Sequence, residues 1–255
     1  MKKLASIIVG LAALAAAPAM AADMPVKYVP PAPPPIFSWS GCYIGVHVGA
    51  GWQASSFVGD VGGSSPSVPA SGVGWLGGGQ AGCNAQWRAF VIGLEGEFWG
   101  STLYDRFFNQ SGPFTSEATS RNRWDAALSV RSGVAFDRAF VYGKLGAVWG
   151  KFEYDALFSA PFGSTTVTGS STITGVLIGV GFEYALTDNW TTKFEYNYID
   201  YGNKIVDFTA TFCNAIGCLT SVSRETVKEI KQLAKIGINY KFGYVGKDPV
   251  VRARY

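Results

Sequence analysis

Apolar residues alternate with small or polar residues at every second position through most of this chain. In residues 42–52 the even positions are apolar, as at Ile44 and Val46, and the odd positions are small or polar, as at Gly45 and His47. This period places successive side chains on opposite faces of a β-strand. The pattern recurs in seven further segments: 75–87, 90–100, 124–136, 140–152, 175–185, 190–201 and 230–242. The sequence therefore predicts an all-β chain of about eight strands.

The connections between these segments alternate in length. Three are tight turns, at 87–90, 137–139 and 186–190, whereas four are long and rich in Gly, Ser, Thr and Asn: 53–73, 101–122, 155–172 and 202–226. Short periplasmic turns and long external loops are typical of outer-membrane barrels, as are aromatic girdles at the strand ends. Aromatic residues lie near the predicted ends at Trp52, Trp87, Phe90, Phe136 and Trp190. We therefore expect a transmembrane, antiparallel, up-and-down β-barrel over residues 41–242, rather than a soluble sandwich.

The N-terminus has the features of a secretory signal peptide over residues 1–21. Lys2 and Lys3 precede an apolar run at 4–17 that is too short to remain as a spanning helix, and Ala19-Met20-Ala21 forms a cleavage site. No cysteine follows the predicted cut, so a lipid-anchored lipoprotein is not expected. After cleavage the protein should reside in the outer membrane.

Segments rich in proline or charge flank the predicted barrel. Residues 22–40 contain six prolines, which favour extended conformations, so this segment is predicted to be a periplasmic linker; a docking arm for a periplasmic partner is the alternative. Residues 243–255 contain Pro249 and several charges, which make a poor lipid-facing strand. They are predicted to be a periplasmic extension.

Three sequence blocks resemble the small outer-membrane β-barrel proteins of alphaproteobacteria, relatives of the OmpA-like transmembrane domain. The blocks are residues 41–45, residues 77–82 and, most specifically, the strand-turn-strand from Gly179 to Gly202. The resemblance covers nearly the whole mature chain. It implies an eight-stranded barrel, a non-enzymatic role in envelope integrity and surface exposure. The chain departs from the family pattern at Cys42, where an aromatic residue is common, and in its four cysteines.

Charged residues recur on the polar face of the predicted strands. The odd or even position of a residue in the alternation, which we call its parity, predicts the face on which its side chain lies. Parity places eleven of the charged residues in the lumen: Glu95, Glu97, Arg123, Asp125, Arg131, Lys144, Glu183, Lys193, Glu195, Lys235 and Lys241. Their charges nearly cancel, and an eight-stranded barrel is just wide enough to be filled by side chains. We therefore expect a paired, polar internal core. A narrow, gated solute pathway, as in a small-solute porin, is the alternative.

Motifs that could indicate catalysis have simpler explanations. Glu95 and Glu97 suggest a glycosidase pair, but residues two apart on one face do not define a substrate cleft. Residues 77–82 match G-x-G-x-x-G but are followed by a strand pattern instead of a helix. His47 is the only histidine, and no flanking signature supports a barrel-embedded lipid hydrolase. No catalytic residue, cofactor or metal is therefore expected.

The expected partners follow from the compartment. A net charge of +3 with 15% charged residues does not indicate a nucleic-acid binder. Outer-membrane lipid, lipopolysaccharide and the barrel assembly machinery are expected partners, and a peptidoglycan component or a surface ligand stays open. The order of residues in 235–242, with Gly237, Tyr240 and Phe242, resembles the assembly signal of a final barrel strand, which is read by backbone pairing.

The cysteines suit an oxidising compartment. Cys213 and Cys218 are five positions apart in the last long connection, a spacing that predicts a local disulfide; zinc would need ligands that are absent nearby. Cys42 and Cys83 lie on predicted neighbouring strands with the same parity. A second disulfide between them is a weaker prediction.

Overall fold

The computed structural model describes residues 37–58 and 70–242, which belong to one compact unit. They form nine strands: β1 (Gly41–Val58), β2 (Ala70–Trp87), β3 (Phe90–Ser101), β4 (Tyr104–Ser111), β5 (Phe114–Phe136), β6 (Ala139–Ala160), β7 (Gly163–Ala185), β8 (Trp190–Cys213) and β9 (Cys218–Phe242). Within the described residues, no helix is long and apolar enough to cross a membrane.

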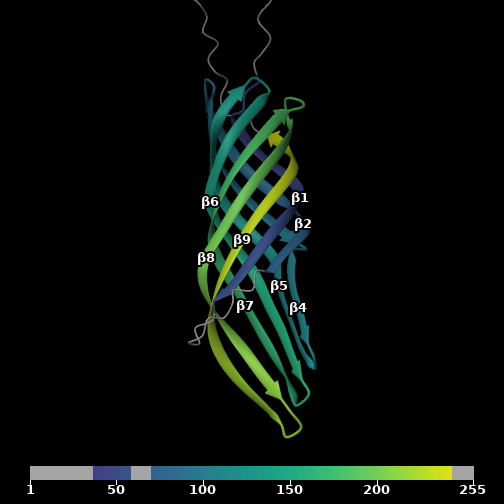
Figure 1. Cartoon of the computed structure of the whole chain (residues 1–255). Coiled ribbons are helices and arrows are strands. Elements are labelled where there is room, and N and C mark those ends of the chain that lie inside the picture. The colour runs from purple at the N-terminus through teal and green to yellow at the C-terminus, as the bar shows by residue number, and fades with distance from the viewer. Residues whose placement is uncertain (1–36, 59–69, 243–255) are drawn as a thin grey trace, which may run out of the picture. The chain divides into compact units, whose positions relative to one another are not determined.

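Eight of these strands form a closed antiparallel ring (Figure 1). Their hydrogen-bonded order is β3-β2-β1-β9-β8-β7-β6-β5, and pairing between β3 and β5 closes the circle. The short β4 follows β3 and pairs with the continuation of β5. Closure leaves no free edge in the ring, as an antiparallel barrel requires. The predicted fold class and the number of strands in the ring are confirmed.

The outward face of the ring is apolar. Val46, Leu94 and Ile178 are 61%, 59% and 56% exposed in the protein alone, because the period of two directs them away from the lumen. Aromatic residues border this apolar band on both sides. On the side of the short turns they are Trp87, Phe90, Phe136, Trp190 and Phe242, and on the opposite side they are Trp52, Trp75 and Trp149. The segments between these two borders match the membrane-spanning part of an outer-membrane barrel.

Trp52, Trp75 and Trp149 form what we call the second aromatic border. Beyond it, the structure differs from the prediction. The connections predicted as long loops are largely β-structure, because the paired strands continue as hairpins that turn at Gly112, at residues 161–162 and at residues 214–217. Threonine, valine and aromatic residues in these segments favour strands, although their overall composition is polar. Of the connection 53–73, only residues 59–69 lie outside the described part.

The end of the ring near the short turns is filled by an apolar cluster. Phe37 and Trp39, from the end of the predicted linker, pack with Phe140 and neighbouring residues. The Trp39 indole donates a hydrogen bond of 3.0 Å to the carbonyl of Asp137. The other parts of the predicted terminal segments, residues 1–36 and 243–255, lie outside the described residues. A second, larger apolar cluster lies nearer the hairpins and includes Trp99.

Two glycines leave room for tyrosines that point into the lumen. A Cβ atom at Gly82 would overlap the ring of Tyr43, and one at Gly181 would overlap the ring of Tyr142. The hydroxyl groups of these tyrosines donate to two buried glutamates, at 2.6 and 2.7 Å. The glycines therefore help to position the polar interior.

Candidate functional site

A layer of charged side chains crosses the lumen between the two aromatic borders. Its members occupy inward-facing positions of β3, β5, β6, β7, β8 and β9, and each is at most 4% exposed. We call the following set the charged layer: Glu95, Glu97, Arg131, Lys144, Glu183, Lys193, Glu195 and Lys235. The alternation of the strands directs these side chains into the lumen, and the pairing register of the strands brings them together although they are distant in sequence.

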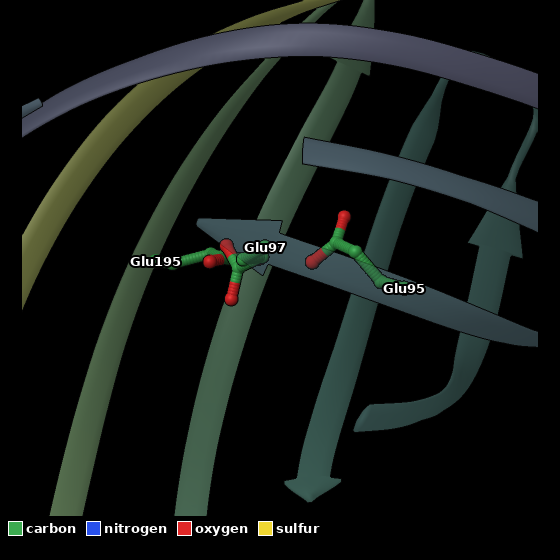
Figure 2. A group of neighbouring side chains, drawn as sticks. All are labelled: Glu95, Glu97 and Glu195. Carbon is green, nitrogen blue, oxygen red and sulfur yellow. The ribbon is translucent and has the colours of Figure 1, made fainter. Parts of the chain in front are cut away.

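Three carboxylates converge in the charged layer. Figure 2 shows Glu95 and Glu97 from β3 and Glu195 from β8 with their carboxylates near one another, and one oxygen of each lies within 4.8 Å of the others. The ammonium group of Lys144 donates to Glu97 at 2.7 Å and to Glu195 at 3.4 Å, and it also hydrogen-bonds Glu95. A lysine therefore occupies the position that a cation would take between these carboxylates.

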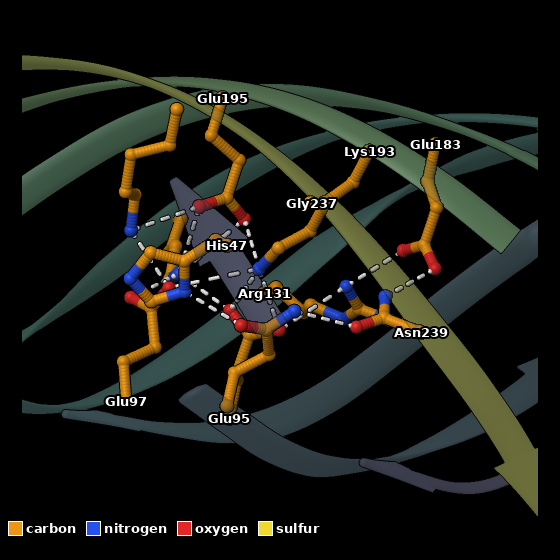
Figure 3. A network of polar contacts seen from close by, with 12 residues as sticks. His47, Glu95, Glu97, Arg131, Glu183, Lys193, Glu195, Gly237 and Asn239 are labelled. Carbon is orange, nitrogen blue, oxygen red and sulfur yellow. Dashed lines mark hydrogen bonds and ion pairs between the residues drawn. The ribbon is translucent and has the colours of Figure 1, made fainter. Parts of the chain in front are cut away.

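Two further lysines complete this arrangement, and Figure 3 labels one of them, Lys193. Lys193 lies 3.1 Å from Glu195 and 3.2 Å from Glu95. Lys235 lies 2.7 Å from Glu97 and 3.2 Å from Glu195. Each carboxylate thus contacts more than one ammonium group, and each lysine bridges two strands or more.

Arg131 extends the layer toward the short turns. Its guanidinium donates to Asn84 and to Glu183, both at 2.9 Å. The same guanidinium lies 4.6 Å from the ring centroid of Tyr43 and 5.1 Å from that of Tyr142, where cation–π attraction adds to the ion pair. An arginine held in this way is fixed in position by three kinds of contact.

The charges of this layer cancel. It contains four carboxylates and four cationic groups, all of them enclosed by the ring. Burying a charge is costly unless the charge is paired and hydrogen-bonded, and here each group meets that condition. The arrangement is therefore a polar core that holds the strands in register, and the three-glutamate group does not need a metal.

The structure places nine of the eleven predicted lumen charges inside the ring. Eight of them form the charged layer. The ninth, Asp125, binds Lys231 at 2.8 Å on the hairpin side of that layer. Arg123 was expected inside, but it is exposed and pairs with Glu153 at 2.7 Å. The reason is a register shift in β5 between residues 122 and 124, which reverses the parity beyond it.

Lys241 was also expected in the network, but it lies apart from it. Its ammonium donates to the carbonyl of Ser38 and lies 4.2 Å from the ring centroid of Phe37. It therefore holds the chain that precedes β1 and neutralises no glutamate of the charged layer. Sequence parity alone could not show this, because the partner lies in a segment without alternation.

The predicted set of lumen charges omits three charged residues of the interior: Asp105, Glu229 and Lys231. Asp105 and Glu229 lie on the hairpin side of the second aromatic border. Continuing the parity of the last strand from Lys235 back through Lys231 would have found Glu229. Asp105 lies in β4, for which no alternation was recognised.

His47 points into the lumen. It is 2% exposed, and its Nδ1 lies 2.6 Å from Oε1 of Gln80. Gln80 in turn donates to Asn239 at 2.7 Å. Within the described residues, no hydroxyl or carboxylate hydrogen-bonds this histidine. The geometry is that of an interior histidine held by an amide network.

Both predicted disulfides are present. Cys42 bonds Cys83 between β1 and β2, and Cys213 bonds Cys218 at the tip of the β8–β9 hairpin. In each pair the two residues face each other directly across neighbouring strands.

The residues of the predicted assembly signal lie on the final strand of the ring. Gly237 faces inward, whereas Tyr240 and Phe242 face outward at 41% and 48% exposure. Their role in assembly stays a prediction.

Comparisons with known proteins agree with this architecture. Residues 9–242 match the family described as "Outer membrane protein beta-barrel domain". The 31 kDa outer-membrane immunogenic protein of Brucella melitensis is 33% identical over 248 residues, which cover 92% of this chain and 98% of the relative. The 25 kDa outer-membrane immunogenic protein of Brucella abortus is 27% identical over 255 residues, covering 95% and 100%.

Among solved structures, the outer membrane protease OmpT from Escherichia coli has a TM-score of 0.52 at 10% identity and covers 81% of this chain and 98% of that one. This likeness concerns the fold alone. The family match and the Brucella relatives, in contrast, span most of the sequence. The chain therefore belongs to the outer membrane β-barrel protein family and is a protein of the outer membrane.

Proposed function

We propose that this chain is a non-enzymatic structural barrel that contributes to envelope integrity and presents its long hairpins at the cell surface. The observation that carries the proposal is the charge-balanced layer that fills the lumen. Export by the predicted signal peptide, insertion by the barrel assembly machinery and contact with lipopolysaccharide belong to the same proposal.

The filled lumen argues against a small-solute porin. In the charged layer, Lys144 alone contacts three carboxylates that come from opposite parts of the ring. Apolar clusters lie on both sides of the layer. A solute would have to separate buried ion pairs to pass, and breaking such a pair costs about 3–5 kcal/mol.

The surroundings of His47 argue against the barrel-embedded lipid hydrolase. Hydrolases of that kind need a nucleophile beside the histidine and access for the lipid. His47 instead contacts Gln80 inside the ring and is enclosed there. Replacing His47 with Gln should leave the lipid A mass profile of the cells unchanged, whereas an altered profile would favour the hydrolase.

Conductance separates the structural barrel from the porin. The purified protein, reconstituted in a planar bilayer, should give no stepwise current, while a porin reconstituted in parallel should. The heat-modifiable mobility of the same sample on a gel confirms that it is folded. Reproducible single-channel steps from folded protein would overturn the proposal.

Surface exposure can be tested on intact cells. The β8–β9 hairpin carries Lys204 and Arg224 beyond the second aromatic border, whereas the short turns carry Arg88 and Arg138. Trypsin added outside should cut the hairpin and leave both turns intact. The relatives are named immunogenic proteins, which supports exposure of the corresponding region here. Cleavage at Arg88 or Arg138 would reverse the orientation.

A further inference from the structure

A second group of buried polar side chains lies inside the ring, on the hairpin side of the second aromatic border. Its six members come from β1, β4, β5, β6 and β9, and each is at most 3% exposed. We call this set the upper chamber: Gln53, Ser55, Asp105, Ser120, Tyr154 and Glu229. It lies outside the membrane-spanning segments, since Ser55 and Glu229 pair three positions beyond Trp52 and Gln232.

Two carboxylates of the upper chamber share one hydroxyl group. Ser55 Oγ lies 2.7 Å from Asp105 Oδ2 and 2.7 Å from Glu229 Oε2. A serine hydroxyl has one proton and can donate it to only one of these oxygens. The other contact requires a proton on a carboxyl group or another positive charge nearby.

The chamber differs from the charged layer because its acids lack a cationic partner. Within the described residues, neither Asp105 nor Glu229 has a lysine or arginine nitrogen within 4 Å; the nearby Lys231 is bound to Asp125 at 2.8 and 3.0 Å. Two carboxylates are thus enclosed without the compensation that the charged layer provides.

Two acceptor oxygens of the chamber are also unsatisfied. Asp105 Oδ1 and Gln53 Oε1 are enclosed and have no hydrogen-bond partner among the described residues. The amide of Gln53 belongs to the chamber, because its nitrogen lies 3.4 Å from Asp105 Oδ2 and 3.4 Å from Ser120 Oγ. Buried polar atoms are almost always partnered, so these two oxygens remain available to a hydrogen-bond donor or to a cation.

We propose that the upper chamber binds a divalent cation, calcium above others, through the carboxylates of Asp105 and Glu229 and the amide oxygen of Gln53. The polar side-chain atoms of the upper chamber are oxygens, apart from the amide nitrogen of Gln53. Such a set of ligand atoms suits a hard cation and does not suit zinc. Calcium accepts six to eight oxygens in flexible geometry, whereas magnesium requires a near-ideal octahedron. The two negative charges match the double positive charge of the ion.

Such an ion would fasten the base of a hairpin to the ring. Asp105 is on β4, which adjoins the ring through β5, whereas Gln53 and Glu229 are on β1 and β9. A shared ion therefore connects three strands where the ring continues into the hairpins (Figure 1). No metal-binding motif is visible in the sequence, because the ligands come from distant segments.

The site can be tested on the purified protein folded in detergent micelles without lipopolysaccharide. After removal of metal with EDTA and then of the EDTA, calcium is titrated by calorimetry, and terbium luminescence sensitised by tyrosine serves as a second signal. The test variant is Asp105→Asn with Glu229→Gln, which keeps the shape of both side chains. The matched control is Glu117→Gln with Asp207→Asn, which removes two exposed acids from the hairpins.

The proposal predicts saturable binding of one calcium ion to the wild-type protein and to the control variant. The test variant should bind at least about tenfold more weakly, as is common when the coordination of a metal is disturbed. Lowering the pH from 7.5 to 5.5 should weaken binding to the wild-type protein, because protons compete for the carboxylates. This comparison needs no variant.

Two results would overturn the proposal. One is the absence of calcium binding by folded wild-type protein at millimolar calcium, which would leave a shared proton as the compensation for the two acids. The other is equal affinity of the wild-type protein and a folded test variant, which would place the ion elsewhere. Should the double variant fail to fold, Glu229→Gln alone serves in its place.

Discussion

Removing one cation from the charged layer should destabilise the barrel far more than removing a surface cation. Lys235 lies 2.7 Å from Glu97 and 3.2 Å from Glu195, and its ammonium is 5.1 Å from the ring centroid of Trp99. In Lys235→Met, four enclosed carboxylates face three cationic groups. Breaking a buried pair in this way costs about 3–5 kcal/mol, because a charge is left uncompensated.

A second substitution tests whether charge balance is the cause. Adding Glu97→Gln to Lys235→Met makes the layer neutral again. The double variant should therefore be more stable than the sum of the two single effects predicts, by about 1–3 kcal/mol. Loss of packing alone would give additive effects, since neutrality would then be irrelevant.

The assay is urea-dependent unfolding in phospholipid vesicles, followed by tryptophan fluorescence and by heat-modifiable gel mobility. The surface control is Arg224→Met, which breaks an exposed pair with Asp207 and should cost less than about 1 kcal/mol. If Lys235→Met is as stable as this control, or if the effects of Lys235→Met and Glu97→Gln simply add, charge balance in the layer does not stabilise the barrel.

Three further predictions concern other parts of the chain. Burial raises the pKa of Glu229 from 4.5 to about 7, so between these pH values the folded chain keeps a proton that the unfolded chain has lost. With divalent cations chelated, stability should therefore fall by up to about 3 kcal/mol as the pH rises from about 4.5 to about 7, and should level off above that. Glu229→Gln should flatten that curve, and an unchanged slope would contradict the assignment. Truncation after Phe242 should leave insertion intact, whereas charged residues at Tyr240 and Phe242 should block it, as judged by heat-modifiable mobility; the reverse pattern would place the assembly signal in the tail. Cys213 and Cys218 should resist maleimide until the protein is reduced, and labelling of both before reduction would show that the disulfide is absent in cells.

Period-two parity was sufficient to predict the ring and most of its interior. It placed Glu95, Glu195 and Lys235 on the lumen face, because side-chain direction in a regular strand depends only on position along the strand. It failed at Arg123, where a register shift in β5 reverses the direction of every residue beyond it. A bulge of this kind depends on pairing with the neighbouring strand, which a single sequence does not display.

The hairpins were mistaken for loops because Gly, Ser, Thr and Asn are frequent in them and because their apolar residues, such as Leu157 and Phe158, do not alternate regularly with polar ones. Outside the membrane-spanning segments neither face of a strand needs to be apolar. The alternation that identifies a strand in the sequence is therefore weaker there. Asp105 and Glu229 were overlooked for this reason, although both are enclosed by the ring. The ion pairs of the charged layer were predictable only in part, since parity gives the face and the ring closure decides which charges meet.

If paired charges close the lumen, a side chain placed inside it should be inaccessible to reagents in water. Ser129 is 2% exposed and lies on β5 beside Glu95, whereas Thr220 is exposed on the β8–β9 hairpin. The native cysteines of the described residues are all in disulfides and should not react. A charged, water-soluble thiol reagent should modify Thr220→Cys rapidly in folded protein and should modify Ser129→Cys only after unfolding. Modification of Ser129→Cys in folded protein at a rate near that of Thr220→Cys would show that the lumen is filled with water and is not closed by paired charges.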